Sequence, residues 1–209
     1  MKKLIVVLMA VLCVAALAPR DLSAGVGIKG GLSLAKFSLT GEMDGAEWKY
    51  LPSWVAGAYL EFKLGFVSVQ PEVLYTRMGA KIEEVIEDVP FSLKYQFDYV
   101  QVPVLLKFNV VPAGPVRPFL YAGGYGGYLL KAKGVMEGGG ESDEADLTEN
   151  FQRFDYGVVG GLGLAFKLPG LSLSVEGRYN YGLANFVKDP LEGESGKNRS
   201  LMALVGIGF

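Results

Sequence analysis

The sequence predicts an all-β fold, namely a closed antiparallel up-and-down transmembrane β-barrel of about eight strands. Segments of about eleven residues alternate between apolar and polar residues, which is the period of a strand with one apolar and one polar face. Past residue 24 no apolar run reaches the roughly 20 residues that a membrane-spanning helix needs, although 50% of the chain is hydrophobic. The connections between these segments are alternately short and long, as in a barrel with its turns at one end.

The first 24 residues have the layout of a secretory signal peptide, in which a lysine pair precedes an apolar run and small residues. Cleavage can follow Ala18 or Ala24, and Pro19 obstructs the first cut, so cleavage after Ala24 is favoured. The expected domains are therefore 1–24, a signal peptide, and 25–209, a single β-barrel domain. The one cysteine leaves with the signal peptide, which excludes a disulfide framework in the mature chain.

The clearest strand runs from Leu171 to Tyr181, where apolar odd-numbered residues alternate with polar even-numbered ones. Its length fits the roughly 9 to 11 residues that a tilted strand needs to cross a bilayer. The same alternation elsewhere gives eight strands and no helix. The expected strands are 25–37, 54–64, 66–78, 95–110, 117–131, 154–166, 171–181 and 200–209.

The fourth expected strand changes phase in its middle, because its apolar residues are odd-numbered through Phe97 and Tyr99 and even-numbered from Val100 onward. A β-bulge near Tyr99 and Val100 would keep both halves facing outward. Pro71 and Pro103 cannot donate to a strand ladder, so they indicate bulges or rim positions.

The uneven connections are typical of an outer-membrane barrel with short periplasmic turns and long extracellular loops. An even strand number leaves both termini in the periplasm. The first and last strands are expected to pair, because an unpaired backbone group in hydrocarbon costs several kcal/mol. Aromatic residues near the strand ends fit an interfacial girdle. The long connections are 38–52, 79–92, 132–152 and 184–199.

Period-two alternation also predicts which side chains face the interior. An eight-stranded barrel is about wide enough for its own side chains to fill, so we expect a network of ion pairs and hydrogen bonds that plugs the lumen. The other interpretation is a narrow polar path or pocket between Glu72, Glu176, Arg178 and Lys107. The expected lumen network is Lys29, Glu61, Lys63, Gln70, Glu72, Gln101, Lys107, Asp155, Lys167, Glu176, Arg178 and Asn180.

The opposite strand face is expected to meet lipid. If the faces were reversed, the same alternation would describe a soluble periplasmic barrel that binds a lipophilic ligand. Strand length and aromatic strand ends favour the membrane version. The expected lipid-facing residues are Trp54, Leu60, Phe62, Val73, Val102, Val104, Leu106, Val158, Leu162, Leu164, Leu173, Val175, Tyr179, Val205, Ile207 and Phe209.

Four segments carry a family resemblance. PEVLY at 71–75, YVQVPVLLK at 99–107, RPFLYAGG at 117–124 and VEGRYNYGL at 175–183 resemble the PorT-like outer membrane protein β-barrel domain family. The resemblance implies a bacterial outer-membrane location and, through the family's namesake, an accessory role in protein secretion. The C-terminal Phe209 resembles the assembly signal of such barrels, which implies the barrel assembly machinery and outer-membrane lipid as partners.

Composition argues against catalysis and against nucleic acid. The chain has no histidine, so the commonest general base and metal ligand is missing, and we expect no enzyme, catalytic residue, metal site or cofactor. Removing residues 1–24 takes away three basic residues and one acidic residue, which leaves 17 basic and 21 acidic residues and a net charge of −4. That acidity does not favour a nucleic-acid partner.

Acidic residues gather in two of the long connections, where carboxylates could bind Ca²⁺, although solvated mobile loops are the simpler interpretation. The acidic residues are Glu83, Glu84, Glu87, Asp88, Glu137, Glu141, Asp143, Glu144, Asp146 and Glu149. Three functions stay open at this point. They are a plugged barrel that acts as a structural or interaction protein with a protein partner at its loops, a small-solute channel, and the soluble ligand-binding barrel.

Overall fold

The computed structural model describes residues 23–40, 48–86, 89–111, 113–138, 141–188 and 194–209. The expected signal peptide lies outside these ranges except for Ser23 and Ala24, which begin the first strand. The described elements are β1 (Ser23–Thr40), β2 (Lys49–Leu64), β3 (Val67–Ile86), β4 (Val89–Asn109), β5 (Val116–Gly138), β6 (Glu141–Asp146), the short 3-10 helix η2 (Thr148–Asn150), β7 (Phe154–Leu168), β8 (Leu171–Gly182) and β9 (Ser195–Gly208).

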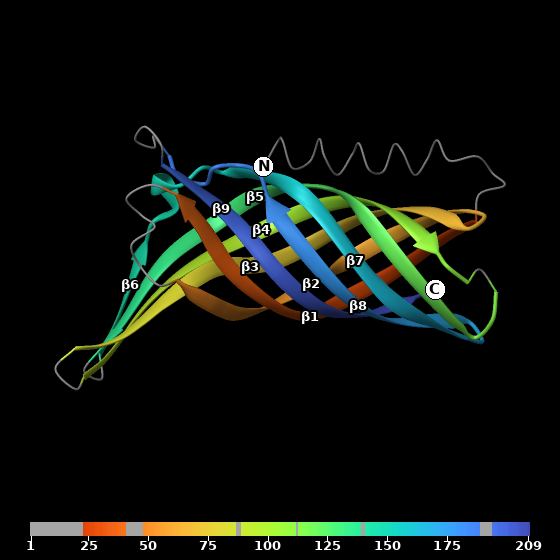
Figure 1. Cartoon of the computed structure of the whole chain (residues 1–209), viewed down its shortest axis with the longest axis horizontal. Helices are drawn as coiled ribbons and strands as arrows, with labels where there is room; N and C mark the ends of the chain where they lie inside the picture. Colours follow the sequence, from red (N-terminus) through yellow and green to blue (C-terminus); the bar gives the residue numbers. More distant parts are fainter. Residues whose placement is uncertain (1–22, 41–47, 87–88, 112, 139–140, 189–193) are drawn as a thin grey trace.

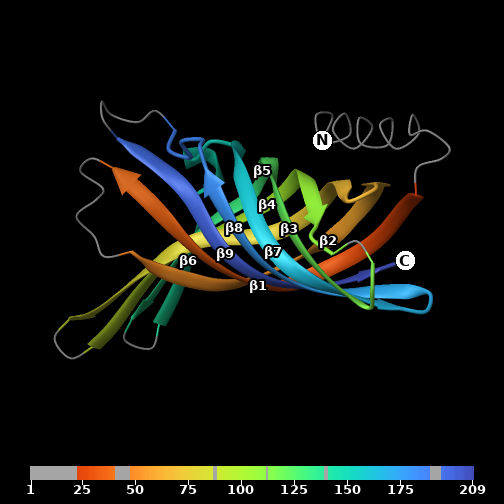
Figure 2. The ribbon, with the colours of Figure 1, turned by 45° about the vertical axis from the view of Figure 1, so that its right-hand side comes forward.

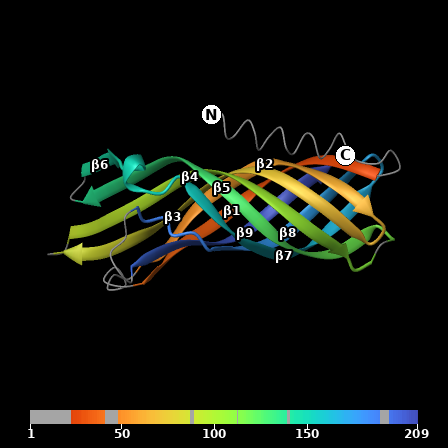
Figure 3. The same cartoon turned by 90° about the horizontal axis from the view of Figure 1, so that it is seen from above.

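Eight strands form a closed antiparallel ring in the order β1, β2, β3, β4, β5, β7, β8, β9 (Figure 1). β9 returns to pair with β1 from Gly27↔Gly208 to Thr40↔Ser195, so the expected pairing of the first and last strands is present. The strands are tilted against the long axis of the barrel (Figure 3). The predicted fold class is therefore confirmed, and the closed ring leaves no edge strand at its centre.

Tight turns lie at one end of the barrel, which we call the turn end. β2 and β3 are joined through Gly65, at a φ of 69°, and β7 and β8 through Gly170, at a φ of 80°. Only glycine adopts these left-handed backbone angles at little cost, so the two glycines permit the tight turns. The opposite end, which we call the loop end, carries the longer connections.

Two expected loops are in fact strand. β3 and β4 stay paired as far as Ile86↔Val89, and β6 pairs with the end of β5 between residues 133 and 146. Strands β3 to β6 therefore project beyond the rest of the barrel as a four-stranded extension (Figures 1 and 2). Five of the six residues of β6 are polar, so no alternation marks that strand, whereas Phe91 to Phe97 of β4 do alternate between apolar and polar residues and offered a signal for the extension.

The bulge expected in β4 lies in β5 instead. Asp98 pairs with Lys131 and Tyr99 pairs with Leu129, so Leu130 is the extra residue. The alternation of β4 is consequently unbroken, and Phe97 and Tyr99 face the interior, where both are fully buried. The expectation that they face outward is wrong, because buried aromatic partners from other strands fill the barrel at this level.

Glycines of β7 make room for large interior rings. Phe119 and Tyr121 of β5 stand directly opposite Gly163 and Gly161, and Tyr125 stands opposite Gly157. A β-carbon at Gly161 would lie 2.5 Å from both the Tyr121 ring and the Gly177 carbonyl oxygen. The rings lie over the glycine backbone, so these glycines serve close packing. In the described ranges no helix is long and apolar enough to cross a membrane.

We expect Gly161→Ala to destabilise the barrel by about 1–3 kcal/mol, because its methyl group overpacks a space that Tyr121 already fills. Gly160→Ala is the matched control, since a β-carbon there meets nothing closer than 3.8 Å. The measurement is urea unfolding of both variants refolded in lipid vesicles. Equal midpoints for the two variants would contradict this packing.

Candidate functional site

A buried ion pair spans the barrel interior. Arg178 on β8 donates from Nη1 to Glu72 Oε2 at 2.7 Å and from Nη2 to Glu72 Oε1 at 2.9 Å. β3 and β8 are four strands apart in the eight-stranded ring, so the pair crosses the full width of the lumen. Both side chains are 1% exposed. A bidentate pair of this kind fixes both position and orientation.

Lys29 on β1 completes a charge-balanced group. Its Nζ lies 2.8 Å from Glu72 Oε1 and 3.0 Å from Glu176 Oε1, and Arg178 Nη2 lies 3.7 Å from Glu176 Oε2. Gln70 Nε2 donates a further hydrogen bond of 2.7 Å to Glu72. The two cations and two carboxylates neutralise one another, as buried charges must.

Each interior cation also lies over an aromatic ring. Lys29 Nζ is 4.8 Å from the ring centre of Tyr59, and the Arg178 guanidinium is 5.2 Å from that of Tyr121. Lys107 Nζ is 4.2 Å from the ring centre of Phe119. The negative faces of these rings stabilise the positive charges where water is scarce.

A second polar layer lies nearer the loop end. Asn198 on β9 donates to Asp155 at 3.2 Å and to the Tyr99 hydroxyl at 3.4 Å, and Tyr125 donates to Asp155 at 3.3 Å. Because β4 and β9 are also four strands apart, the contact between Tyr99 and Asn198 is a second bridge across the lumen. Asn180 on β8 donates to Gln101 on β4 at 3.3 Å.

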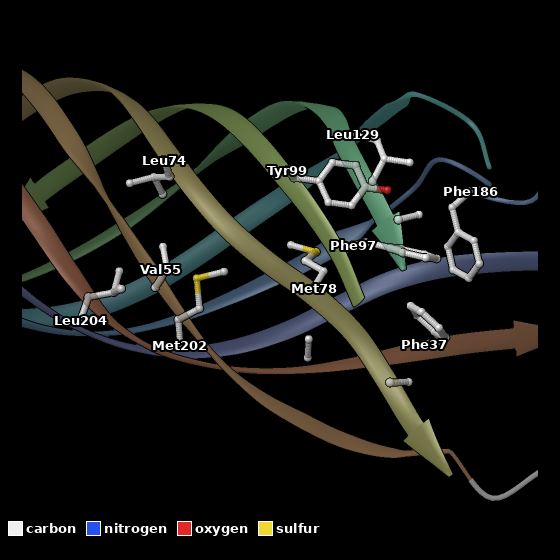
Figure 4. Packing of buried hydrophobic residues seen from close by; sticks show 13 residues of the cluster. Phe37, Val55, Leu74, Met78, Phe97, Tyr99, Leu129, Phe186, Met202 and Leu204 are labelled. Atoms are coloured by element: carbon white, nitrogen blue, oxygen red, sulfur yellow. The ribbon is translucent and has the colours of Figure 1, made fainter. Parts of the chain in front are cut away.

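Beyond this layer an aromatic plug fills the interior at the loop end. Phe37, Phe97 and Phe186 meet with ring centres 4.7 to 5.5 Å apart (Figure 4). Phe151 adds a fourth ring, 4.6 Å from Phe97. Phe186 follows β8 in the chain, so the described start of that connection packs into the interior at the loop end.

The turn end is more open. A hollow of about 270 Å³ is lined there by residues that include Glu61, Lys63, Lys107, Arg117 and Lys167. Lys107 Nζ lies 3.1 Å from Glu61 Oε1, and Lys63 Nζ lies 3.9 Å from Glu61 Oε2. Cations outnumber carboxylates in this mouth.

The expected lumen residues divide into two groups. Nine are buried, and of these Lys107 lies beside the turn-end hollow, where it pairs with Glu61, whereas Glu61, Lys63 and Lys167 are only partly buried and line that hollow. The buried residues are Lys29, Gln70, Glu72, Gln101, Lys107, Asp155, Glu176, Arg178 and Asn180, all at most 8% exposed.

The expected lipid-facing residues mostly stand exposed on the outer face. Leu162, Val175 and Val205 are 68%, 54% and 56% exposed, and the outer face of every ring strand carries apolar residues. Leu60, Val73, Val102 and Ile207 are partly covered. Phe62 differs from the other expected lipid-facing residues. It alternates with the inward Glu61 and so lies on the outer face, yet it is buried, with only 8% of its surface exposed.

Several interior residues lie where the sequence does not predict them. The expectation of aromatic rings at the lipid boundary places Tyr99 and Phe97 outside, although alternation counted back from Gln101 places them inside, where both are buried. Asn198 and Ser200 continue the even-numbered inward face of β9, and that alternation was the available signal.

Most of the acidic residues expected in mobile loops lie in strands of the extension. Lys94 Nζ lies 2.7 Å from Glu137, and Lys133 Nζ donates to Glu144 at 2.7 Å, which holds the pKa of that carboxyl below its ordinary value. Glu87 and Asp88 lie outside the described residues. In the described ranges no three acidic residues gather as a metal site.

We expect Arg178→Ala to lower the unfolding free energy by about 3–5 kcal/mol, because it leaves Glu72 buried with half of its charge compensation. The unfolding temperature in detergent, followed by heat-modifiable gel migration, measures the loss.

Arg153→Ala is the control for the same truncation at the surface, where Arg153 Nη2 pairs with Glu149 Oε1 at 2.6 Å. Exposed pairs contribute about 0–1 kcal/mol, so this variant should melt almost as the wild type does. An Arg178→Ala variant that melts unchanged would exclude the charge-balanced interior.

Solved structures share this architecture at low sequence identity. The outer membrane protease OmpT from Escherichia coli is 9% identical with a TM-score of 0.51, over 90% of this chain and 96% of that one. Neisserial surface protein A is 16% identical with a TM-score of 0.47, over 89% and 97%. A major outer membrane protein from Thermus thermophilus is 14% identical with a TM-score of 0.48, over 90% and 98%. At 9% identity the similarity to OmpT concerns the fold alone.

A family model is more specific. No curated protein matches the chain. The model named outer membrane protein beta-barrel domain matches residues 18–188, which include β1 to β8. The charged interior, the apolar exterior and the closed ring all agree with that description. This chain therefore belongs to the outer membrane protein beta-barrel domain family, and its place is the bacterial outer membrane.

Proposed function

We propose that this protein is a closed outer-membrane barrel that acts as a structural and interaction protein, with a lumen too filled to conduct. The observation that carries the proposal is the pair of bridges across the lumen, Glu72 to Arg178 and Tyr99 to Asn198, with the aromatic plug stacked beyond them. A solute would have to break a bidentate buried ion pair to pass.

The polarity of the two faces argues against the soluble ligand-binding barrel. Glu176 and Arg178 lie inside, whereas Leu173, Val175 and Tyr179 of the same strand lie outside. A lipocalin-like barrel needs the opposite arrangement, with an apolar interior for its ligand. The absence of histidine from the sequence likewise supports a role without catalysis.

We expect the purified wild-type protein to show no stepwise conductance in a planar bilayer in about 1 M KCl, because the two polar bridges and the aromatic plug occupy the lumen beyond the turn-end hollow. A general porin measured in the same bilayer is the positive control. Reproducible single-channel steps from the wild type would overturn the plugged barrel and favour the small-solute channel.

The interaction surface in this proposal is the extension formed by β3 to β6 at the loop end. It lies outside the ring and presents charged side chains on an exposed edge strand, β6. Acidic residues on an edge strand discourage indiscriminate pairing with other chains, which suits a selective contact. The PorT-like resemblance directs the first search for a partner to components of protein secretion.

A photo-crosslinking amino acid at Met136, which is 48% exposed on the extension, should give protein adducts in intact cells. The same label at Leu173, which is 36% exposed on the outer face of β8, should give lipid adducts only. Mass spectrometry of the adducts distinguishes the two results. Identical adducts at both positions would argue against the extension as the docking surface.

A further inference from the structure

Four side chains form a row across the outer face of β2, β1, β9 and β8. Lys36 on β1 stands directly opposite Arg199 on β9, and Tyr181 on β8 stands directly opposite Arg199 on its other side. Lys36 Nζ lies 5.7 Å from the ring centre of Tyr50 on β2, and the Arg199 guanidinium lies 4.7 Å from that of Tyr181. Two cations thus sit side by side between two aromatic rings, and we call this the basic row.

The basic row lies where the apolar surface ends. Toward the middle of the barrel the next outward pairs are Leu34↔Leu201 and Leu32↔Ala203, and toward the loop end the next is Ser38↔Lys197. Leu32 and Leu201 are 69% and 51% exposed. The row is therefore at the boundary between the acyl chains and the headgroups on the extracellular side, where aromatic rings are also favoured.

The two cations lack a partner of opposite charge. In the described part of the chain neither Lys36 nor Arg199 forms an ion pair. Arg199 donates from Nη2 to the Tyr181 hydroxyl at a long 3.5 Å, and its buried Nε has no hydrogen-bond partner. Like charges directly opposite on neighbouring strands destabilise a sheet. Lys29, Arg178, Glu72 and Glu176 balance one another in the interior of the same barrel, so this partly buried like-charge pair on the outer face is a distinct feature.

A hollow of about 430 Å³ lies at the row. Its lining includes Lys36, Tyr50, Tyr179, Arg199 and Leu201. Tyr50 and Tyr179 are 53% and 43% exposed, so the rings stand at its open side. The hollow thus brings two unneutralised cations together with the rings of Tyr50 and Tyr179 and the apolar side chain of Leu201. This combination suits a group with an anionic head and an apolar tail.

We propose that the basic row binds the phosphate of a phosphorylated lipid in the outer leaflet of the outer membrane. The phosphate would lie between Lys36 and Arg199 and relieve their repulsion through charge-assisted hydrogen bonds. The acyl chains of the lipid would follow the apolar surface below the row, along Leu34 and Leu201. This site is independent of whether the lumen conducts.

The probe for the test is diphosphoryl lipid A, added to the refolded full chain in neutral detergent and counted by native mass spectrometry. Wild type should retain one such lipid, and the charge-neutral Lys36→Gln/Arg199→Gln variant should bind it at least about 10-fold more weakly. Lys36→Arg/Arg199→Lys should keep most of the affinity. Heat-modifiable migration verifies that each variant is folded.

Lys133→Gln/Arg153→Gln is the matched control, because it removes the same charge from two loop-end cations that pair with Glu144 and Glu149. It should bind lipid A as wild type does. Equal affinity of the Lys36→Gln/Arg199→Gln variant and wild type would overturn the site. Equal wild-type affinity for lipid A and phosphatidylcholine, or displacement of lipid A by inorganic phosphate at the same concentration, would overturn the assignment to a lipid phosphate.

Discussion

Backbone hydrogen bonding in hydrocarbon is the constraint on which this structure depends. A strand within a bilayer must pair on both sides, and the register from Gly27↔Gly208 to Thr40↔Ser195 supplies the pairs that an open sheet would lack. Closing only eight strands leaves an interior about as wide as its own side chains. The need to close the ring therefore creates the need to fill it.

Charged side chains that fill the interior must be neutralised by partners of opposite charge. Glu72 accepts from Arg178, Lys29 and Gln70, so its carboxylate is surrounded by donors. Removing one charged partner leaves another charge buried and uncompensated, which destabilises the protein more than the intact ion pairs stabilise it. The ion pairs therefore form only when every strand has its correct register. The bridges from β3 to β8 and from β4 to β9 tie opposite walls together, and this favours a rigid closed barrel over a pore.

With the lumen filled, the surfaces that remain for binding are the loop end and the outer face of the barrel. The proposed function assigns the contact with a protein partner to the extension of β3 to β6, which projects beyond the ring. The proposed lipid site is the basic row around Lys36 and Arg199, which follows the apolar pair Leu34↔Leu201. A barrel with a filled lumen can act only through surfaces of these two kinds, one facing water and one facing lipid.

The alternation in the sequence by itself determined the eight ring strands and placed Glu176 and Arg178 on one face of their strand, because period two leaves a side chain only two faces. Strand length and aromatic strand ends, also read from the sequence, predicted that this polar face points inward, and the cost of unpaired backbone groups in hydrocarbon predicted the closed ring. The alternation did not reveal β6, whose residues are almost all polar, or the bulge at Leu130. Tertiary structure alone decided which inward charges meet across the lumen, that Phe97 belongs to a plug, and that Lys36 stands opposite Arg199. Those contacts depend on strand register and ring order, and a single strand carries no information about either.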